Sequence, residues 1–312
     1  MEVSIIIPHY NSVDTLFRLL DSIVFDDNTE VIVVDDKSCS LELEKIKKSK
    51  YINKVKFVIN DGTKGAGSCR NIGLKLATKK WILFADADDF YLDNYLNIIN
   101  KNFDSKMDVI YFKPKSCFSD TLEVANRDKE FKNLIENYKK NRNIESLNDL
   151  KYNWVVPWSK LIKIDILKKN NIVFDECIAA NDVMFSIKLA KESLNIKIVE
   201  EEIYCVTVHK GSLTLNLSEE NFDSRFEILK RKNYFFQKNN LKKFITPGIS
   251  YLIRSRKYGF KKMMKVSFYV LKNIKYCFNS RREWKEIMIK IILEKKKIEK
   301  YTTKKNGKSY KI

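Results

Sequence analysis

The feature that most constrains the fold is a series of four short apolar segments within residues 1–90, each followed directly by polar or acidic residues. The segments are rich in Val, Ile and Phe and are shorter than a typical buried helix, so we expect them to form buried β-strands. Between the first two, the segment Asn-Ser-Val-Asp-Thr at 11–15 precedes apolar residues at helical spacing, which predicts a capped amphipathic helix. The four predicted strands are 3–8, 30–36, 55–61 and 81–86.

Strands that alternate with helices predict a doubly wound α/β sheet. Ligands of such sheets bind beyond the carboxyl ends of the strands. Those ends are 8–11, 35–38 and 86–89, and all three are polar. The sequence therefore predicts that the polar chemistry lies along one edge of the sheet.

The rest of the chain extends this domain and adds a second segment. With 312 residues, 44% of them hydrophobic, the chain can bury one large core and an appendage. Residues 108–118 are predicted to be a strand, residues 196–209 a strand pair or one long strand, and residues 157–169 and 183–191 helices. The polar segment 131–149 receives no assignment. We expect the first domain to cover residues 1–218 and an accessory segment, mainly helical, to cover 219–312.

The formal net charge of +19 comes entirely from the last third of the chain. Residues 219–312 contain 27 Lys and Arg against 8 Asp and Glu, so residues 1–218 carry no net charge. Within this segment Phe260, Met264, Phe268 and Leu271 recur every three or four residues between lysines, as do Ile274 and Phe278, which predicts a basic amphipathic helix. Its apolar stretches are far shorter than the roughly 18 to 20 residues of a membrane span. We therefore expect it to lie on an anionic membrane surface, although solvated helix faces remain an alternative.

The six cysteines are scattered without a CxxC pair, which favours reduced thiols. The chain begins directly with an apolar, strand-like run and shows neither a basic region nor a cleavage site of a secretory signal. Together with the basic segment, these observations predict a cytoplasmic protein that is peripheral on the inner face of the cell membrane.

Asp86 and Asp88 follow the fourth predicted strand in an Asp-x-Asp pattern. Carboxylate oxygens at a sheet edge can hold Mg²⁺ or Mn²⁺ against phosphate groups. The pattern alone is common, and an equally simple interpretation is a turn or a cap of the following helix. The surrounding segments decide between these interpretations.

Four segments, in this order and spacing, resemble family 2 glycosyltransferases of the GT-A fold, of the type that builds bacterial surface polysaccharides. The resemblance is strong over the first 90 residues, weaker to about residue 214, and does not include the basic segment. The segments are VSIIIPHYN at 3–11, VIVVDDKS at 31–38, GAGSCRNIG at 65–73 and WILFADADD at 81–89.

The resemblance implies an inverting transfer of a sugar from a nucleoside-diphosphate donor, UDP-linked, to a glycan or polyprenyl-linked acceptor in capsule, lipopolysaccharide or other surface-polysaccharide synthesis. The sugar would be of the hexosyl or N-acetylhexosaminyl class. Asp88, helped by Asp86, would hold Mn²⁺ or Mg²⁺, and Asp182 would be the catalytic base. His209 could complete the metal shell, although a lone histidine at a strand end is more often a surface or packing residue.

The resemblance also implies the residues that bind the donor. The loop of Pro8 and Tyr10, together with Asp36, would hold the base and the ribose, and Arg70 would reach the nucleotide. An acidic side chain can accept from the uracil N–H, and a guanidinium is a planar donor for nucleotide oxygens. In the loop that follows the last predicted strand, Lys210 and Ser212 would close over the diphosphate.

Asn181 departs from the family pattern, because an acid commonly precedes the base at this point. Acceptor contacts and the tuning of Asp182 are therefore in doubt, and a helix cap is the alternative interpretation of both residues. Tyr152, Trp154 and Trp158 could stack on a sugar, but aromatic residues in such a stretch more often belong to the core.

Two other classes of function remain as alternatives. A basic segment with interleaved Tyr and Phe also suits a nucleic-acid-binding protein, and Asn181 suits an inactive glycan-binding relative. The neutral first domain and its acidic strand ends argue against nucleic acid, because clustered Asp repels phosphate. We therefore expect no nucleic-acid partner.

Overall fold

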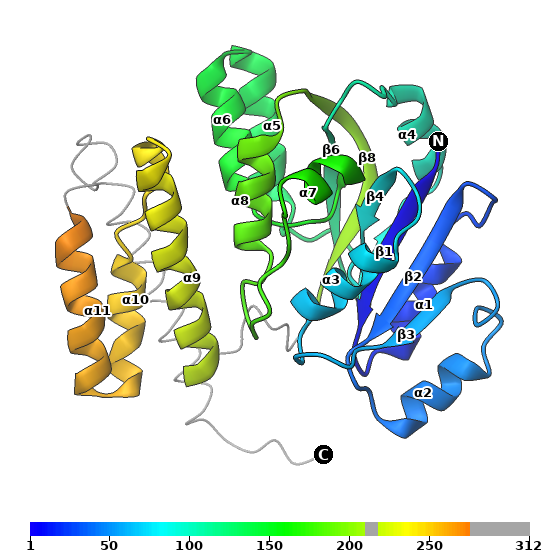
Figure 1. Ribbon diagram of the computed structural model, residues 1–312, viewed down its shortest axis with the longest axis horizontal. Coiled ribbons are helices and arrows are strands. Elements are labelled where there is room, and N and C mark those ends of the chain that lie inside the picture. The colour runs from blue at the N-terminus through cyan, green and yellow to red at the C-terminus, as the bar shows by residue number, and fades with distance from the viewer. Residues whose placement is uncertain (210–217, 275–312) are drawn as a thin grey trace. The chain divides into compact units, whose positions relative to one another are not determined.

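The computed structural model describes residues 1–209 and 218–274 (Figure 1). The chain divides into two compact units, Met1–Ser224 and Arg225–Ile312. This division falls within helix α9 (Glu219–Lys238), a few residues after the predicted boundary at 218. The separate roles predicted for the two segments remain predictions.

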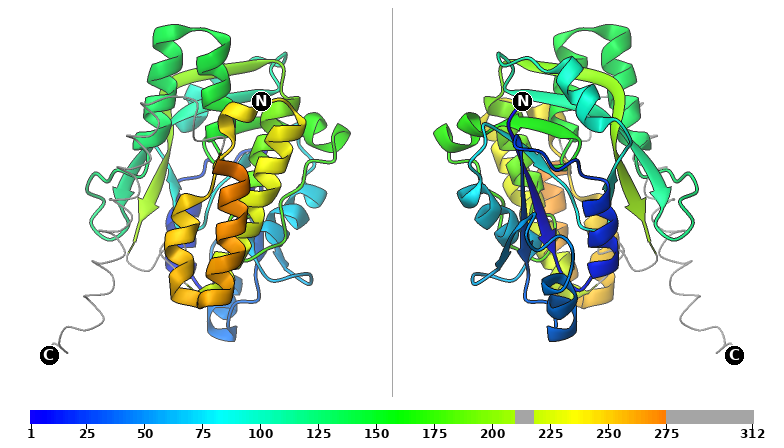
Figure 2. Two further views of the ribbon diagram at one scale, coloured as in Figure 1. Left: turned by 90° about the vertical axis from the view of Figure 1, so that its left-hand side faces the viewer. Right: turned by 90° about the vertical axis from the view of Figure 1, so that its right-hand side faces the viewer.

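The first half of the first unit alternates parallel strands with helices, and the four predicted strands are confirmed. In the first, second and fourth of these strands the apolar side chains are almost completely buried, as expected for strands covered by helices on both faces. The third strand lies at the edge of the sheet and is only partly buried, so the expectation of a buried strand was wrong there. Figure 2 shows α1 and α3 on opposite faces of the sheet. The strands are β1 (Val3–His9), β2 (Thr29–Asp35), β3 (Lys56–Ile59) and β4 (Trp81–Phe84), and the helices are α1 (Val13–Asp21), α2 (Ser40–Lys47) and α3 (Ala66–Leu76).

Four further strands complete a mixed sheet in the order β3-β2-β1-β4-β7-β6-β8-β5. The chain proceeds outward from β1 to β3 and then returns to β4 on the other side of β1, so the strand order reverses between β1 and β4. In sheets of this kind, ligands bind at the carboxyl ends of the strands where the order reverses. The further strands are β5 (Phe90–Tyr91), β6 (Val109–Phe118), β7 (Lys160–Lys163) and β8 (Ile196–Val208).

The prediction of one helix over residues 157–169 was wrong in its first half. Ser159 has φ 58°, which interrupts any helix at that point. The chain then forms β7, which pairs antiparallel with both β4 and β6, before helix α7 (Ile164–Lys169) begins. A run as short as Lys-Leu-Ile-Lys has no period that separates a strand from a helix, so the pairing partners decide.

The polar segment without a sequence-based assignment forms two helices, α5 (Lys129–Asn141) and α6 (Ile144–Asn153). Arg142 has φ 45° and ends α5, and Asn143 caps α6 by accepting a hydrogen bond from the Ser146 backbone N–H at 2.8 Å. The remaining helices are α4 (Tyr95–Asn102) and α8 (Val183–Glu192), of which α8 confirms a prediction.

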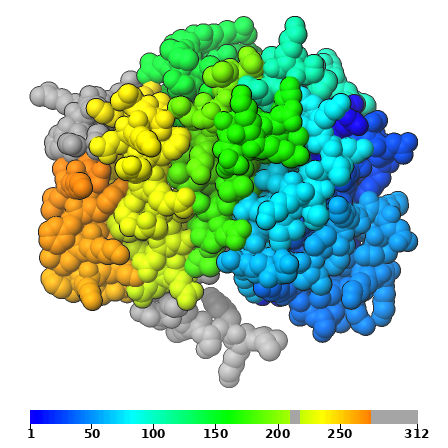
Figure 3. Space-filling view, viewed as in Figure 1, coloured from blue at the N-terminus to red at the C-terminus, as the bar shows by residue number. Residues whose placement is uncertain are grey.

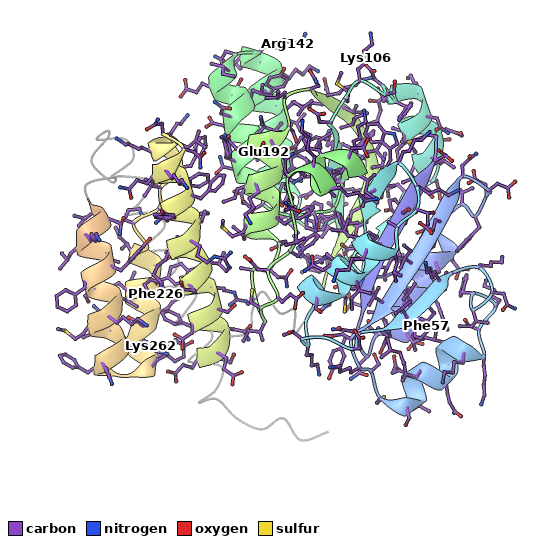
Figure 4. The ribbon with its side chains drawn as sticks, in the orientation of Figure 1. Phe57, Lys106, Arg142, Glu192, Phe226 and Lys262 are labelled. Carbon is purple, nitrogen blue, oxygen red and sulfur yellow. The ribbon has the colours of Figure 1, made fainter. Side chains whose placement is uncertain are left out.

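The second unit contains the end of α9, α10 (Ile249–Ser255) and α11 (Phe260–Asn273), with short 3₁₀ turns at Lys242–Phe244 and Arg256–Tyr258. The three helices lie side by side (Figure 2, left). Phe226 of α9, labelled in Figure 4, packs edge-on against Tyr269 of α11 with ring centroids 5.3 Å apart. The predicted amphipathic helix is confirmed over 260–273, and Phe278 lies outside the described residues. No helix in the described residues is long and apolar enough to span a membrane.

Candidate active site

The ends of β1 and β2 are joined by a buried hydrogen-bonded pair. His9 Nδ1 lies 2.8 Å from Asp35 Oδ2, and its Nε2 accepts the Ser12 backbone N–H at 3.2 Å. With Nε2 as the acceptor from Ser12, Nδ1 is the ring nitrogen that donates to Asp35. Burial favours a higher pKa for Asp35, but the hydrogen bonds from His9 and Ser38 outweigh it and leave the pKa below its ordinary value. Asp35 is therefore a structural anion that fixes the two loops.

The next residue, Asp36, is held by the loops that follow β3. Its Oδ1 accepts hydrogen bonds from the Asn60 side-chain amide at 2.8 Å and from the Gly65 N–H at 3.0 Å. Tyr10 is exposed nearby, with the Lys64 ammonium 4.0 Å from the centre of its ring. The structure thus brings Tyr10 and Asp36 to adjacent strand ends, and Pro8 lies opposite Val34 in the same pair of strands.

The loop after β4 is held by β8. The Asp86 N–H donates to the Tyr204 hydroxyl at 2.9 Å, and that hydroxyl donates to Asp89 at 2.7 Å. The Thr207 N–H donates to the other oxygen of Asp89 at 2.7 Å, and the Thr207 hydroxyl donates to the Asp88 carbonyl at 2.8 Å. Asp89 is fully buried, so it acts as the fixed point of the loop.

Three carboxylates crowd together in this loop. One oxygen from each of Asp86, Asp88 and Asp89 lies within 4.8 Å of the others. Burial and the charge of Asp86 raise the pKa of Asp88, and burial with the charges of both neighbours raises the pKa of Asp89 well above its ordinary value. Such a group favours a compensating cation. His209 Nε2 lies 2.9 Å from Asp88 Oδ2, so carboxylates and one imidazole converge here.

This donor set fits Mg²⁺ or Mn²⁺, because both take oxygen ligands and Mn²⁺ also accepts imidazole. The two oxygens of Asp89 are already hydrogen-bonded to Tyr204 and Thr207. Asp86 is paired with Arg70, and Asp88 contacts His209. The assignment of Asp86, Asp88 and His209 as metal ligands therefore stays a prediction.

Arg70 connects this loop to the predicted catalytic segment. Its side chain is buried, donates to Asn181 Oδ1 at 2.9 Å and forms an ion pair with Asp86. Its guanidinium lies 5.3 Å from the centre of the Phe174 ring, which adds a flat support. The guanidinium of Arg70 on α3 therefore contacts both Asp86 after β4 and Asn181 before α8.

Asp182 occupies the N-cap position of α8, but its side chain makes no capping hydrogen bond. Burial raises the pKa of its carboxyl above the ordinary value, and the positive charge of Arg70 only partly opposes this shift. The carboxyl is therefore not explained by helix capping. Perturbed pKa values are common among functional groups, and the role of Asp182 as catalytic base stays a prediction.

The aromatic residues considered for acceptor stacking belong to the core. Trp154 and Trp158 are buried, as is Tyr152, and Trp158 stacks on Tyr204 with ring centroids 5.9 Å apart. The core interpretation is confirmed and the stacking interpretation is wrong. Lys210 and Ser212 lie outside the described residues.

Sequence reasoning missed the residues that support the site from a distance. Arg18 of α1 donates to the Asp88 carbonyl and to the Ser119 carbonyl, the latter at 2.8 Å. Tyr204 and Thr207 of β8 clamp the loop, although they are 115 or more positions away from the Asp89 carboxyl that they bind. No local pattern marks such residues, because only the pairing of β8 with β5 brings them to the loop.

Comparison with known proteins agrees with this architecture. The model for the family described as "Glycosyl transferase family 2" matches residues 4–163. A poly(ribitol-phosphate) β-glucosyltransferase of Bacillus spizizenii is 29% identical over 247 residues, which is 73% of this chain but 36% of that protein. A cholesterol galactosyltransferase of Borreliella burgdorferi is 24% identical over 326 residues, which is 96% of this chain and 85% of that protein.

Solved structures show the same fold. A crystal structure of residues 1–349 of Staphylococcus aureus TarS superposes with a TM-score of 0.53 at 25% identity and covers 73% of this chain and 64% of that one. A further structure of the same fragment, in complex with UDP-GlcNAc, gives a TM-score of 0.55 at 23% identity, with 82% of this chain and 80% of that one covered. The chain therefore spans little more than a third of the poly(ribitol-phosphate) glucosyltransferase and somewhat under two thirds of the first TarS fragment.

Proposed function

Because the chain belongs to glycosyl transferase family 2, we propose that it transfers a sugar from a nucleoside-diphosphate donor to a hydroxyl group with inversion at the anomeric carbon. The observation that supports this most directly is the position of Arg70. One guanidinium contacts Asp86 of the carboxylate loop and Asn181, the neighbour of Asp182. The residues proposed for the leaving group and for the acceptor therefore lie on either side of a single cation.

In this mechanism each side chain has a separate task. Asp182 accepts the proton of the acceptor hydroxyl while that oxygen attacks the anomeric carbon, and the diphosphate leaves from the opposite face with the electrons of the broken C–O bond. Arg70 donates hydrogen bonds toward the diphosphate oxygens. Asp86, Asp88 and His209 would hold Mn²⁺ or Mg²⁺, which when bound supplies positive charge to the departing diphosphate.

The donor is proposed to be UDP-linked. Asp36 is fixed by Asn60 and Gly65, which leaves a carboxylate that can accept from the N–H of uracil. Pro8 and Tyr10 lie at the end of the neighbouring strand β1 and are proposed to contact the base and the ribose. The TarS fragment of similar fold has been solved with UDP-GlcNAc, which makes UDP-sugars the first donors to test.

The acceptor is proposed to be a glycan, polyprenyl-linked or otherwise lipid-linked, in the synthesis of a bacterial surface polysaccharide. Two named relatives support this choice, since one glycosylates poly(ribitol-phosphate) and the other cholesterol. Such an acceptor implies work at the anionic inner face of the cell membrane. The side-chain oxygen of Asn181 accepts a hydrogen bond from Arg70. We therefore propose that Asp182, and not Asn181, contacts the acceptor.

The test is a thermal-shift screen of nucleotide sugars with and without Mn²⁺, followed by hydrolysis of the donor that binds. We expect UDP and one UDP-sugar to raise the unfolding temperature only when Mn²⁺ or Mg²⁺ is present, because ligand binding to the folded state adds to its stability. Slow release of UDP from that donor would distinguish an enzyme from an inactive glycan-binding relative. A shift caused by RNA or DNA, with none caused by any nucleotide sugar, would overturn the proposal.

A further inference from the structure

Helix α11 has two apolar faces, of which one packs inside the second unit. Val266 and Val270 are 0% and 4% exposed. Tyr269 packs against Phe226, and its hydroxyl accepts a hydrogen bond from the Asn233 side-chain amide at 2.6 Å. The contacts that fix α11 in its unit therefore come from this inner face.

The other apolar face is exposed. Phe260, Phe268 and Leu271 are 70%, 66% and 64% exposed, and Met264 is 39% exposed. The four residues are separated by four, four and three positions, which aligns them in one row along the helix. In Figure 3 the side chains of α11, in orange, lie at the surface of the second unit, and Figure 4 shows side chains that project from its outer side. A continuous row of this kind, unlike scattered apolar residues, marks an interaction surface. We name it the apolar row.

Positive charge borders the apolar row. Lys261, Lys265 and Lys272 are exposed, and helical geometry places all three along the same side of the row. The described part of the second unit, residues 225–274, contains 14 Lys and Arg and a single acidic residue, Glu227. The partner of this surface must therefore combine negative charge with an apolar layer.

We propose that the apolar row and its three lysines form a membrane-docking surface, which inserts into the interface of a bilayer that contains anionic lipid. The apolar side chains enter the boundary between headgroups and acyl chains, while the lysines contact lipid phosphates. The biological purpose of this docking surface rests on the proposed function at the membrane, whereas the observations on α11 do not depend on it. A second copy of the chain is the poorer partner, because two such faces would oppose their lysines. Nucleic acid matches the charge but offers no layer for Met264 and Leu271.

The test is co-sedimentation of the full chain with vesicles of phosphatidylcholine in which one lipid in three is phosphatidylglycerol. Wild type should bind these vesicles and ignore pure phosphatidylcholine. The double variant Phe268→Ser/Leu271→Ser should bind at least about tenfold more weakly at all salt concentrations. The variant Lys261→Ala/Lys265→Ala should weaken binding at low salt and reduce its salt dependence, because only charge is screened by ions. Phe260→Ser, about two turns away at the other end of the row, provides an independent test.

Leu194→Ser is the matched control, because Leu194 is 85% exposed but belongs to the first unit. It should bind vesicles like wild type. Unfolding temperatures should be unchanged for all variants, and UDP binding with Mn²⁺ should persist, so a failure of the donor chemistry would be seen separately from a failure of docking. The proposal is overturned if wild type does not bind anionic vesicles or if the row variants bind them normally. It is also overturned if the row variants have a lower unfolding temperature, which would mean that the chain itself covers the row, or if these variants convert a dimer to a monomer. Tight RNA binding that depends on the same row would also overturn it.

Discussion

Tyr204 donates a hydrogen bond of 2.7 Å from its hydroxyl to the carboxylate of Asp89, and both side chains are shielded from solvent. The same hydroxyl accepts the Asp86 N–H at 2.9 Å. One phenol of β8 therefore fixes both ends of the loop that presents the Asp-x-Asp pattern. The position of the predicted metal ligands therefore depends on a residue that lies 118 positions further along the chain.

The first prediction concerns this phenol. Tyr204→Phe leaves the Asp86 N–H and one Asp89 oxygen without their partner, which should lower the free energy of unfolding by about 1 to 3 kcal/mol. It should also weaken Mn²⁺ binding by about tenfold or more, as the loss of residues that orient ligands generally does. Urea unfolding and metal titration measure the two effects.

Tyr91→Phe is the control for Tyr204→Phe. The Tyr91 hydroxyl is equally buried but has no hydrogen-bond partner within the described residues. Removal of this hydroxyl should leave the free energy of unfolding unchanged or slightly raised, and it should not change the affinity for Mn²⁺. Equal losses in the two variants would show that the packing of the rings, and not the hydrogen bonds, determines the stability of the loop.

The second prediction concerns Asp88. Asp88→Asn keeps the shape of the side chain and removes one of three crowded negative charges, so the fold without metal should be as stable as wild type or more stable at pH 7. Transfer in the presence of Mn²⁺ should fall by at least about 10², and the stabilisation by Mn²⁺ with UDP should disappear. Asp93 is an exposed acid shortly after the same loop. Asp93→Asn should change neither the transfer rate nor the stabilisation by Mn²⁺ with UDP. Full transfer by wild type in EDTA would rule out the metal assignment.

The sequence predicted the elements whose pattern is local. The apolar runs at 3–8, 30–36 and 81–86 identify buried strands, because strands of a parallel sheet that helices cover on both faces are apolar along their whole length. The position of the polar residues at the strand ends followed from the same pattern, and the structure brings Asp36, Asp86 and Asp88 to one edge.

The sequence could not predict the elements that depend on distant pairing. Lys160–Lys163 is a strand because β4 and β6 flank it, and its four residues carry no periodic signal of their own. The contact of Arg70 with Asn181 joins residues 111 positions apart. The exposed row on α11 was predicted as an amphipathic stripe, but only the structure shows that Val266 and Val270, and not the stripe, pack inside the unit.

The third prediction concerns Lys160, which is fully buried and donates to the Trp154 carbonyl at 2.8 Å. Burial lowers its pKa from 10.5 to about 7. Between these values the unfolded chain binds the proton and the folded chain does not, so this lysine makes stability rise as the pH increases from about 7 toward 10. Lys160→Met should remove that rise.

The diagnostic quantity is the change of the free energy of unfolding with pH. Loss of the hydrogen bond to Trp154 lowers the free energy of unfolding by the same amount at every pH, so it does not alter this slope. Urea unfolding at several pH values measures the slope. Lys163→Met, on the same strand but only partly buried, should retain the slope of wild type. If Lys160→Met also retains it, the lysine is charged in the folded protein throughout this range.

The last prediction concerns Asp182, whose catalytic and capping interpretations predict opposite changes in stability. Burial raises the pKa of this carboxyl, so the folded protein binds its proton more tightly than the unfolded chain does. Stability contributed by Asp182 is therefore lost as the pH rises from the ordinary aspartate range through the raised pKa. Asp182→Asn removes this loss, so at pH 7 the variant should be at least as stable as wild type. A capping side chain would have the opposite effect, because its removal costs about 1 kcal/mol.

Activity should respond in the other direction. A base works only when it is deprotonated, so the raised pKa moves the acid limb of the wild-type pH profile above that of an ordinary carboxylate. Asp182→Asn should lower kcat by about 10² to 10⁴, leave UDP binding intact and remove that acid limb from the residual activity. Asp165→Asn is the matched control, since Asp165 is an exposed acid in the first turn of α7 and should change stability by less than about 1 kcal/mol with no change in kcat. An Asp182→Asn variant that turns over normally but unfolds more easily would return the residue to the role of a helix cap, and the base would then have to be sought elsewhere around Arg70.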